Sequence, residues 1–321
     1  MKARDLFFPE CLSVVDSHTE GEPTRVVVEG WPALEGATMI ARQADFHRRF
    51  DHLRRAVVGE PRGHDAVMGA LLTPPTEAGS AAGVVFFDGA GQVGMCGGGV
   101  IGVVKTLQHL GRLGQGTARI DTPAGTVKAE LTPDGAVTIE IGPAFCHARD
   151  VPLEVPGVGR VVGDVAWGGN WFFLARLPGV ELKLKRAAEL TEKALLVKKA
   201  LGEKGVTGKD GAEVDHIQLF SPTRRKDADG RNFVLVPGDV FDRSPCGTGT
   251  AARMAALYAR GLLRPGQPWR QESITGGLFT GWLTRDVERL IPHIRGRAFI
   301  TGRGTLYYHP EDELRGGLGK D

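Results

Sequence analysis

Two stretches of the sequence follow the same order: a cysteine, then small residues, then an apolar run with helical spacing. The first is Cys96-Gly97-Gly98-Gly99 followed by 100–110, and the second is Cys246-Gly247-Thr248-Gly249-Thr250 followed by 251–258. Each pattern predicts a cysteine at the N-terminus of a helix, where free backbone N–H groups and the helix dipole favour negative charge. The cysteines are 150 positions apart (246 − 96), close to half the chain. We therefore expect two related lobes, each presenting one thiol.

Composition places the chain among ordinary globular proteins and excludes several partners. The 321 residues suffice for one large or two medium domains. Basic and acidic residues nearly balance, 40 against 38, so we expect no nucleic-acid and no membrane partner. Four cysteines are too few for a disulfide framework, and the N-terminus lacks a secretion signal. We therefore expect a cytoplasmic protein.

The order of predicted elements indicates an α+β fold of two similar lobes. Short strands are expected over much of the chain, among them 12–18 and 25–30 as a hairpin, 67–72, 82–87, 161–166, 170–175 and 232–236. Helices are expected over 38–55, after each cysteine, and over 191–202 with Thr191 as N-cap. We assign 1–127 plus 299–321 to the N-terminal lobe with Cys96, and 128–298 to the C-terminal lobe with Cys246. No low-complexity linker separates the lobes, so we expect a tight cleft.

Several motifs resemble the proline racemase and hydroxyproline epimerase family, with the greatest likeness to its 4-hydroxyproline 2-epimerase branch. The string Asp242-Arg243-Ser244-Pro245-Cys246-Gly247-Thr248-Gly249-Thr250 is highly specific. The stretches 17–25, 60–64 and 168–172 match the family as well. The agreement extends over nearly the whole chain.

The resemblance implies a fold and a site. Each lobe would be a β-barrel-like sheet wrapped around a central helix, as in diaminopimelate epimerase, with the active site in the cleft. By similarity, Cys96 and Cys246 are the two acid/base residues, and a small imino acid is the substrate. The groups implied to surround the substrate's carboxylate and ring nitrogen are Asp242, Gly247, Thr248, Gly97 and Gly98. A homodimer is implied by the same resemblance.

One position departs from the family pattern. The first cysteine motif of the family usually reads Cys-Gly-His-Gly, whereas this chain has Gly98 in place of the histidine. The change affects the predicted substrate, because that imidazole would lie beside it. Relatives that dehydrate 3-hydroxyproline replace the first cysteine with Ser or Thr, so Cys96 argues against that activity.

The chemistry explains why two thiols are needed. Inverting Cα requires removing a proton from one face and returning one to the other, which a thiolate and a thiol facing each other can do. Helix N-termini would stabilise the charge that builds up on the substrate carboxylate. Asp242 could hold the protonated ring nitrogen. No lysine motif calls for pyridoxal phosphate, so no cofactor is expected.

We therefore expect a cofactor-independent epimerase that converts trans-4-hydroxy-L-proline to cis-4-hydroxy-D-proline. One alternative keeps the mechanism and changes the substrate to proline or another amino acid, for which Gly98 leaves space. The other is a non-catalytic protein that binds amino-acid carboxylates with its thiols idle. A disulfide between the two cysteines would be an inactivated state.

The remaining candidates divide between site and structure. His216 lies on a predicted strand entering the second lobe, where it either faces the substrate or is a buried structural histidine, and we count it among the substrate-binding candidates. Cys11 and Cys146 are interpreted as small buried hydrophobic residues. No metal site is expected, because neither Cys-x-x-Cys nor His-x-x-x-His spacing occurs.

Overall fold

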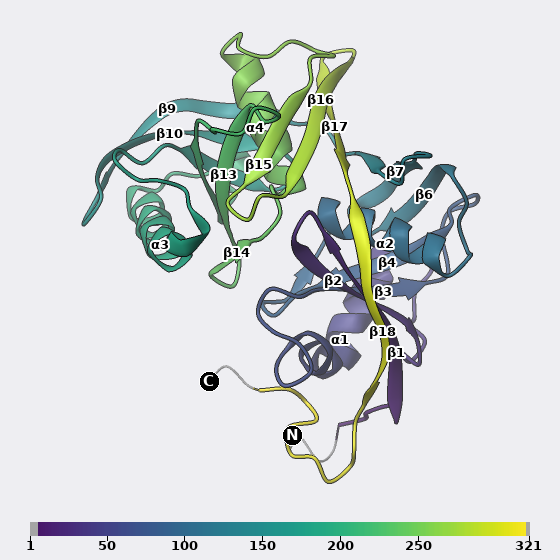
Figure 1. Ribbon diagram of the computed structural model, residues 1–321. Helices are drawn as coiled ribbons and strands as arrows, with labels where there is room; N and C mark the ends of the chain where they lie inside the picture. The colour runs from purple at the N-terminus through teal and green to yellow at the C-terminus, as the bar shows by residue number, and fades with distance from the viewer. Residues whose placement is uncertain (1–5, 319–321) are drawn as a thin grey trace. The chain divides into compact units, whose positions relative to one another are not determined.

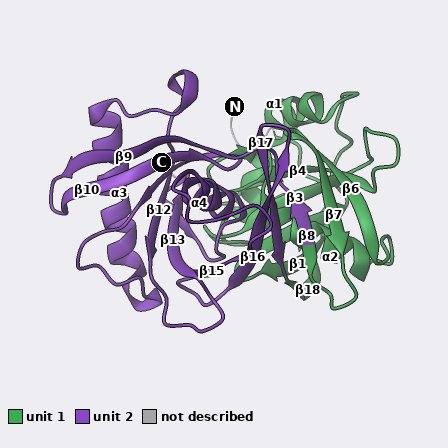
Figure 2. Cartoon of the chain, turned by 90° about the horizontal axis from the view of Figure 1, so that it is seen from above, with its two compact units in different colours: residues 1–137, 297–321 green, residues 138–296 purple. Residues whose placement is uncertain are grey.

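The structure, a computed structural model, describes the chain except residues 1–5 and 319–321. The chain divides into two compact units: unit 1 comprises 1–137 and 297–321, and unit 2 comprises 138–296 (Figure 2). The ends of the expected N-terminal lobe, 1–5 and 319–321, lie outside the described residues.

The units divide at places that differ from the sequence-based boundaries. The expected border between 127 and 128 falls inside β7 (Gly125–Leu131), which pairs along its length with β6 (Gly116–Thr122). The observed border lies after Val137, ten residues later (137 − 127), so this hairpin stays within unit 1. The chain returns to unit 1 at Arg297, two residues before the expected position (299 − 297).

Unit 1 is a sheet curved around one helix. Its strands pair in the order β18 (Ala298–Tyr307), β1 (Cys11–Thr19), β2 (Glu22–Glu29), β3 (Met68–Thr73), β4 (Ala82–Phe87), β6 and β7. The β2–β3 and β4–β6 pairs are parallel, and the others are antiparallel. Helix α2 (Gly97–His109) contacts β1, β2, β3, β7 and β18, so strands from both ends of the series reach it (Figure 1).

Unit 2 repeats this plan. Its strands pair in the order β9 (Phe145–Val155), β10 (Gly159–Trp167), β11 (Trp171–Ala175), β12 (His216–Ser221), β13 (Gly230–Val236), β15 (Trp269–Ser273), β16 (Leu278–Asp286) and β17 (Arg289–Gly296). The β11–β12 and β13–β15 pairs are parallel. Helix α4 (Gly247–Ala259) contacts β9, β10, β11, β16 and β17.

The two units therefore share one plan of paired strands around a central helix. A short strand precedes each central helix: β5 (Gln92–Val93) before α2, and β14 (Val240–Asp242) before α4. Each short strand pairs with the long strand that precedes it, β4 or β13. β8 (Val137–Glu140) begins at the border and pairs with β17. The repeated cysteine-to-helix pattern thus reflects a repeated fold, and the expected α+β class with two similar lobes is confirmed.

An outer helix covers part of the sheet in each unit. α1 (Met39–Val58) packs on β3, β4 and β6, and α3 (Ala187–Lys204) packs on β9, β12 and β13. α1 has Thr38 as N-cap, whose hydroxyl accepts from the Ala41 N–H at 3.2 Å. Buried side chains such as Phe46 and Phe87 in unit 1, and Phe173 and Leu190 in unit 2, form the core beneath these helices.

The predicted start of α3 is wrong. The helix begins at Ala187, four residues before the predicted N-cap Thr191 (191 − 187). A 3₁₀ turn over Leu184–Arg186 leads directly into it. The guanidinium group of Arg186 donates two hydrogen bonds of 2.7 Å to the Glu189 carboxylate, which holds the first turn in place of a capping hydroxyl.

None of the helices in the described part of the chain has the length and apolar character that a membrane crossing requires.

Candidate active site

Cys96 is the N-cap of α2. Its sulfur accepts a hydrogen bond from the Gly99 N–H at 3.3 Å, and its carbonyl accepts from the Val100 N–H at 2.9 Å. The side chain is half-buried, and the backbone is extended with φ −127°. The thiol is therefore at the positive end of the helix dipole, where its anionic form is stabilised.

The glycines that follow Cys96 are not equivalent. A Cβ on Gly99 would lie 2.6 Å from Cε1 of Phe86, so only glycine fits there. A Cβ on Gly98 would meet nothing nearer than Thr19, at 3.9 Å. The fully buried Thr19 donates from its hydroxyl to the Gly98 carbonyl at 2.9 Å. Packing therefore explains the glycine at 99 but not the one at 98.

Cys246 is the N-cap of α4 and is more buried, with 6% of its surface exposed. Its sulfur accepts from the Gly249 N–H at 3.4 Å, as Cys96 accepts from Gly99, and it lies 3.5 Å from the Thr248 hydroxyl. The backbone of Cys246 has φ +61°, a conformation that costs a non-glycine residue about 1–3 kcal/mol. Such backbone strain persists only where the surrounding structure enforces the conformation, and this conformation fixes the direction of the Cys246 side chain.

The loop before α4 supplies that constraint. The Asp242 carboxylate accepts from the Ser244 N–H at 2.8 Å, and the Ser244 hydroxyl accepts from the Cys246 N–H at 3.0 Å. The Asn232 side chain donates to the Pro245 carbonyl at 2.8 Å. These hydrogen bonds explain the residue types of the Asp-Arg-Ser-Pro-Cys string, since each polar side chain fixes a backbone group.

The turn between β10 and β11 holds Thr248 from the other side. The Asn170 side chain donates to the Thr248 hydroxyl at 3.2 Å. A Cβ on Gly168 would lie 2.2 Å from the Thr248 carbonyl oxygen, so this turn touches the first turn of α4 directly. In unit 1 the end of β1 contacts the first turn of α2, since the Thr19 hydroxyl donates to the Gly98 carbonyl.

The structure brings the predicted residues together within each unit. In unit 1, Gly97 and Gly98 form the first turn of α2 beside Cys96. In unit 2, Gly247 and Thr248 form the first turn of α4, and Asp242 ends β14 four residues before Cys246 (246 − 242).

His216 begins β12 and is 7% exposed. Its Nδ1 is 2.6 Å from an Asp215 carboxylate oxygen, and its ring centroid is 4.7 Å from that of Phe172. Burial raises the pKa of Asp215, but the hydrogen bond and charge of His216 outweigh burial and leave that pKa below its usual value. Cε1 of Phe172 would lie 3.2 Å from a Cβ on Gly249, so Phe172 packs against the N-terminus of α4. The His216 imidazole therefore lies one ring away from that helix end.

Three polar residues beside the cysteines were not singled out from the sequence: Thr19, Asn170 and Gln218. Gln218 is fully buried, and its carbonyl oxygen would lie 2.4 Å from a Cβ on Gly249. Among the described residues its side-chain amide has no hydrogen-bond partner. Thr19 and Asn170 lie in two of the stretches that carry the family resemblance, 17–25 and 168–172. That position was the sequence feature by which they could have been identified as site residues.

The other two cysteines lie on strands, Cys11 on β1 and Cys146 on β9. Burial, followed by the negative charge of Asp164, raises the pKa of the Cys146 thiol to about 11. Such a thiol stays protonated near neutral pH and is unsuited to act as a base. Within the described residues, no group of three or more His, Cys, Asp and Glu side chains converges as metal ligands would.

The fold matches solved structures of proline racemases and hydroxyproline epimerases. One is a hydroxyproline epimerase from Agrobacterium vitis with bound trans-4-hydroxy-L-proline, with TM-score 0.85 and 27% identity over 97% of this chain and 95% of that one. Another is a probable proline racemase from Agrobacterium radiobacter with bound carbonate, also with TM-score 0.85 and 27% identity, covering 96% of each chain. The class defined by the fold is therefore the two-lobed epimerases.

Sequence comparison narrows this class. The proline racemase family model matches residues 14–319. A 4-hydroxyproline 2-epimerase of Chromohalobacter salexigens is 48% identical over 95% of this chain and 97% of its own length. A second 4-hydroxyproline 2-epimerase, from Pseudomonas putida, is 47% identical over 96% of this chain and 99% of its own length. The chain belongs to the proline racemase family.

Proposed function

We propose that this protein is a 4-hydroxyproline 2-epimerase, which interconverts trans-4-hydroxy-L-proline and cis-4-hydroxy-D-proline without a cofactor. The observation that carries the proposal is the pair of thiols held alike: each is a helix N-cap whose sulfur accepts from the N–H three residues on. Relatives at 46–48% identity bear the name of this activity.

Two thiols suit inversion because a single base tends to return the proton to the face it came from. In the proposed reaction one thiolate removes the Cα proton while the other thiol donates a proton to the opposite face. The roles of Cys96 and Cys246 reverse with the direction of the reaction. The mechanism requires both sulfur atoms to reach the same Cα, with one unit supplying each.

The helix N-termini would supply the electrostatic part of catalysis. Removing the Cα proton shifts negative charge onto the substrate carboxylate, and backbone N–H groups of the Gly97–Gly98 and Gly247–Thr248 turns are suited to stabilise it. Asp242 would bind the protonated ring nitrogen through a charge-assisted hydrogen bond. His216 is proposed as a further substrate contact at the α4 end.

Gly98 favours a second candidate substrate class with the same mechanism. A Cβ there would meet no atom nearer than 3.9 Å, so the packing leaves room beside Cys96. That room would accept imino acids with larger ring substituents than hydroxyproline. A panel of proline, 4-hydroxyproline and bulkier ring-substituted prolines, compared by kcat/KM, separates the two classes.

The experiment that tests the proposal is epimerisation in heavy water. The reduced protein is incubated with trans-4-hydroxy-L-proline, and the products are followed by chiral chromatography and proton NMR. The proposal predicts cis-4-hydroxy-D-proline carrying deuterium at Cα, at a rate unchanged by chelators or added pyridoxal phosphate. Saturable binding without exchange, unaffected by thiol alkylation, would instead indicate a binding protein.

We also propose a cytoplasmic location and a homodimer. Four cysteines in 321 residues are too few for a disulfide framework, as expected of a protein from a reducing compartment. Light scattering on the purified protein measures the assembly, and a monomer at micromolar concentration would contradict the homodimer.

A further inference from the structure

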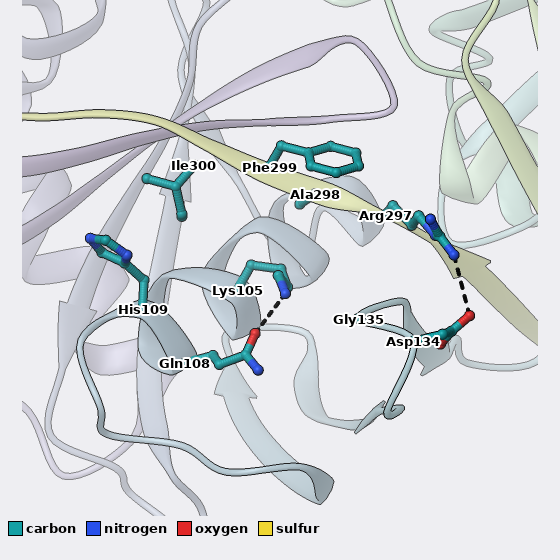
Figure 3. A pocket seen from close by; sticks show the side chains of 9 residues that line it. All are labelled: Lys105, Gln108, His109, Asp134, Gly135, Arg297, Ala298, Phe299 and Ile300. Carbon is teal, nitrogen blue, oxygen red and sulfur yellow. Dashed lines mark hydrogen bonds and ion pairs between the residues drawn. The ribbon is translucent and has the colours of Figure 1, made fainter.

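A pocket of ≈ 330 Å³ lies within unit 1, away from the first turn of α2. The last turn of α2, the turn at Asp134–Gly135 and the start of β18 line this open pocket (Figure 3). The side chains that line it include Lys105, Gln108, His109, Asp134, Arg297 and Ile300. Because Cys96 caps the opposite end of α2, the pocket is separate from the proposed catalytic thiol.

The pocket carries positive charge that the protein neutralises poorly. The Lys105 ammonium group donates to the side-chain oxygen of Gln108 at 2.6 Å, and that acceptor is neutral. No carboxylate of the described residues is within ion-pair distance of Lys105. The guanidinium group of Arg297 is 3.4 Å from the Asp134 carboxylate, with both side chains half exposed (52% and 47%). An exposed pair at this distance contributes little and is readily exchanged for another anion.

The basic side chains are spread along the pocket rather than gathered at one point. Figure 3 shows Arg297 with Asp134 at one end, His109 at the other and Lys105 between them. Lys105 and His109 are one helical turn apart, about 6 Å along α2. Ile300 and the buried Ala298 of β18 provide an apolar wall. Separated cations beside an apolar wall suit a short aliphatic chain with an anionic group at each end.

We propose that this pocket binds a small aliphatic dianion of the dicarboxylate class. The Lys105 ammonium group pairs with one carboxylate of the ligand. The Arg297 guanidinium group leaves Asp134 and pairs with the ligand's other carboxylate, and the ligand's methylene groups lie against Ile300. The Lys105 ammonium group donates only to the neutral Gln108, and the Arg297 guanidinium group shares an exposed ion pair with Asp134. Binding therefore weakens as ionic strength rises.

The pocket is joined to the Cys96 site by a short series of hydrogen bonds. The Arg297 N–H donates to the Glu20 carboxylate at 2.9 Å, and the Arg297 carbonyl accepts from the Glu20 N–H at 3.1 Å. The next residue, Ala298, pairs with Thr19, whose hydroxyl donates to the Gly98 carbonyl at 2.9 Å. A ligand that shifts the start of β18 therefore acts on the turn beside Cys96, so the dianion is also a regulator of that site.

Calorimetric titration of the full-length protein tests binding without reference to any activity. Succinate and glutarate are the probes, acetate is the singly charged control, and inorganic phosphate distinguishes a compact dianion from an extended one. Lys105→Gln and Arg297→Gln remove the proposed partners. Lys128→Gln and Arg119→Gln remove the same charges from exposed positions on the β6–β7 hairpin of unit 1.

We expect one succinate or glutarate to bind per chain. Lys105→Gln or Arg297→Gln should weaken the binding affinity at least tenfold, and either control variant should weaken it less than twofold. Phosphate and acetate should bind at least tenfold more weakly than the dicarboxylates. No saturable binding, equal binding of phosphate, or equal weakening by the control variants would overturn the proposal.

A second measurement tests the link to Cys96. The rate at which iodoacetamide labels Cys96, followed by peptide mass spectrometry, should change at least twofold with saturating succinate and stay constant in Lys105→Gln. An unchanged rate in the unsubstituted protein despite saturation would overturn the regulatory part. Because neither readout depends on epimerisation, failure here is distinguishable from failure of the proposed function.

Discussion

The hydroxyl oxygen of Thr248 lies 3.5 Å from the sulfur of Cys246. The Asn170 side chain donates to the same hydroxyl oxygen at 3.2 Å, so the hydroxyl proton of Thr248 is available to the sulfur when Cys246 is a thiolate. The corresponding residue in the other cysteine motif is Gly98, which has no side chain. The first turn of α4 therefore places a hydroxyl group beside its cysteine at a position where the first turn of α2 has no side chain.

Replacing Thr248 with valine removes that donor and keeps the side-chain shape. A hydrogen bond to a charged group contributes about 1.5–3 kcal/mol, so the thiolate of Cys246 should be less populated at neutral pH. We predict an alkylation rate of Cys246 lowered at least about fivefold in Thr248→Val. Thr248→Ser, which keeps the hydroxyl, should restore most of the rate. An unchanged rate in Thr248→Val would show that the hydroxyl does not stabilise the anion.

The backbone strain at Cys246 predicts an unusual stability difference. At φ +61° alanine is strained and glycine is not, whereas Cys96 is extended at φ −127°. Cys246→Gly should be more stable than Cys246→Ala by about 1–3 kcal/mol in urea unfolding. The matched pair Cys96→Gly and Cys96→Ala should differ by about 1 kcal/mol or less. Equal differences at the two positions would contradict the strain.

The two glycines after Cys96 should respond oppositely to alanine. In Gly99→Ala the new methyl group would lie 2.6 Å from Phe86, so we predict a loss of about 1–3 kcal/mol of folding free energy. In Gly98→Ala the nearest atom is 3.9 Å away, so stability should be unchanged or rise by up to about 1 kcal/mol. The stable Gly98→Ala variant should nevertheless show altered kcat/KM for bulkier substrates. Destabilisation by Gly98→Ala would mean that packing requires this glycine.

Thiol labelling against pH should separate Cys146 from the two capping cysteines. Its pKa, raised to about 11 by burial, keeps it protonated at pH 8. We predict that iodoacetamide at pH 8 labels Cys96 well before Cys146, and that labelling of Cys146 rises only as the pH approaches 11. Peptide mass spectrometry at several pH values measures this, and early labelling of Cys146 would contradict its buried setting.

The repeated cysteine-to-helix pattern could be predicted from the sequence because the glycines and the helix after each cysteine have local causes. Glycine at 99 and 249 is required by side chains packed against it, and the helices that follow are apolar. β9 was missed in the sequence, since most of its residues are exposed and the apolar alternation at Val151, Leu153 and Val155 is confined to its second half. The strain at Cys246 was not predictable, because hydrogen bonds of the folded loop before α4 enforce it. The contact of Asn170 with Thr248 was not predictable either, because it joins residues far apart in the sequence.

In the proposed mechanism two thiols, one from each unit, share the inversion of one carbon. The most direct measurement compares Cys96→Ser, Cys246→Ser and the control Cys146→Ser in the conversion of trans-4-hydroxy-L-proline to cis-4-hydroxy-D-proline. We predict that each of the first two lowers kcat at least about a hundredfold, as loss of a general acid or base does, while Cys146→Ser stays near the parent rate. Epimerisation at the parent rate by either Cys96→Ser or Cys246→Ser would contradict the two-thiol mechanism.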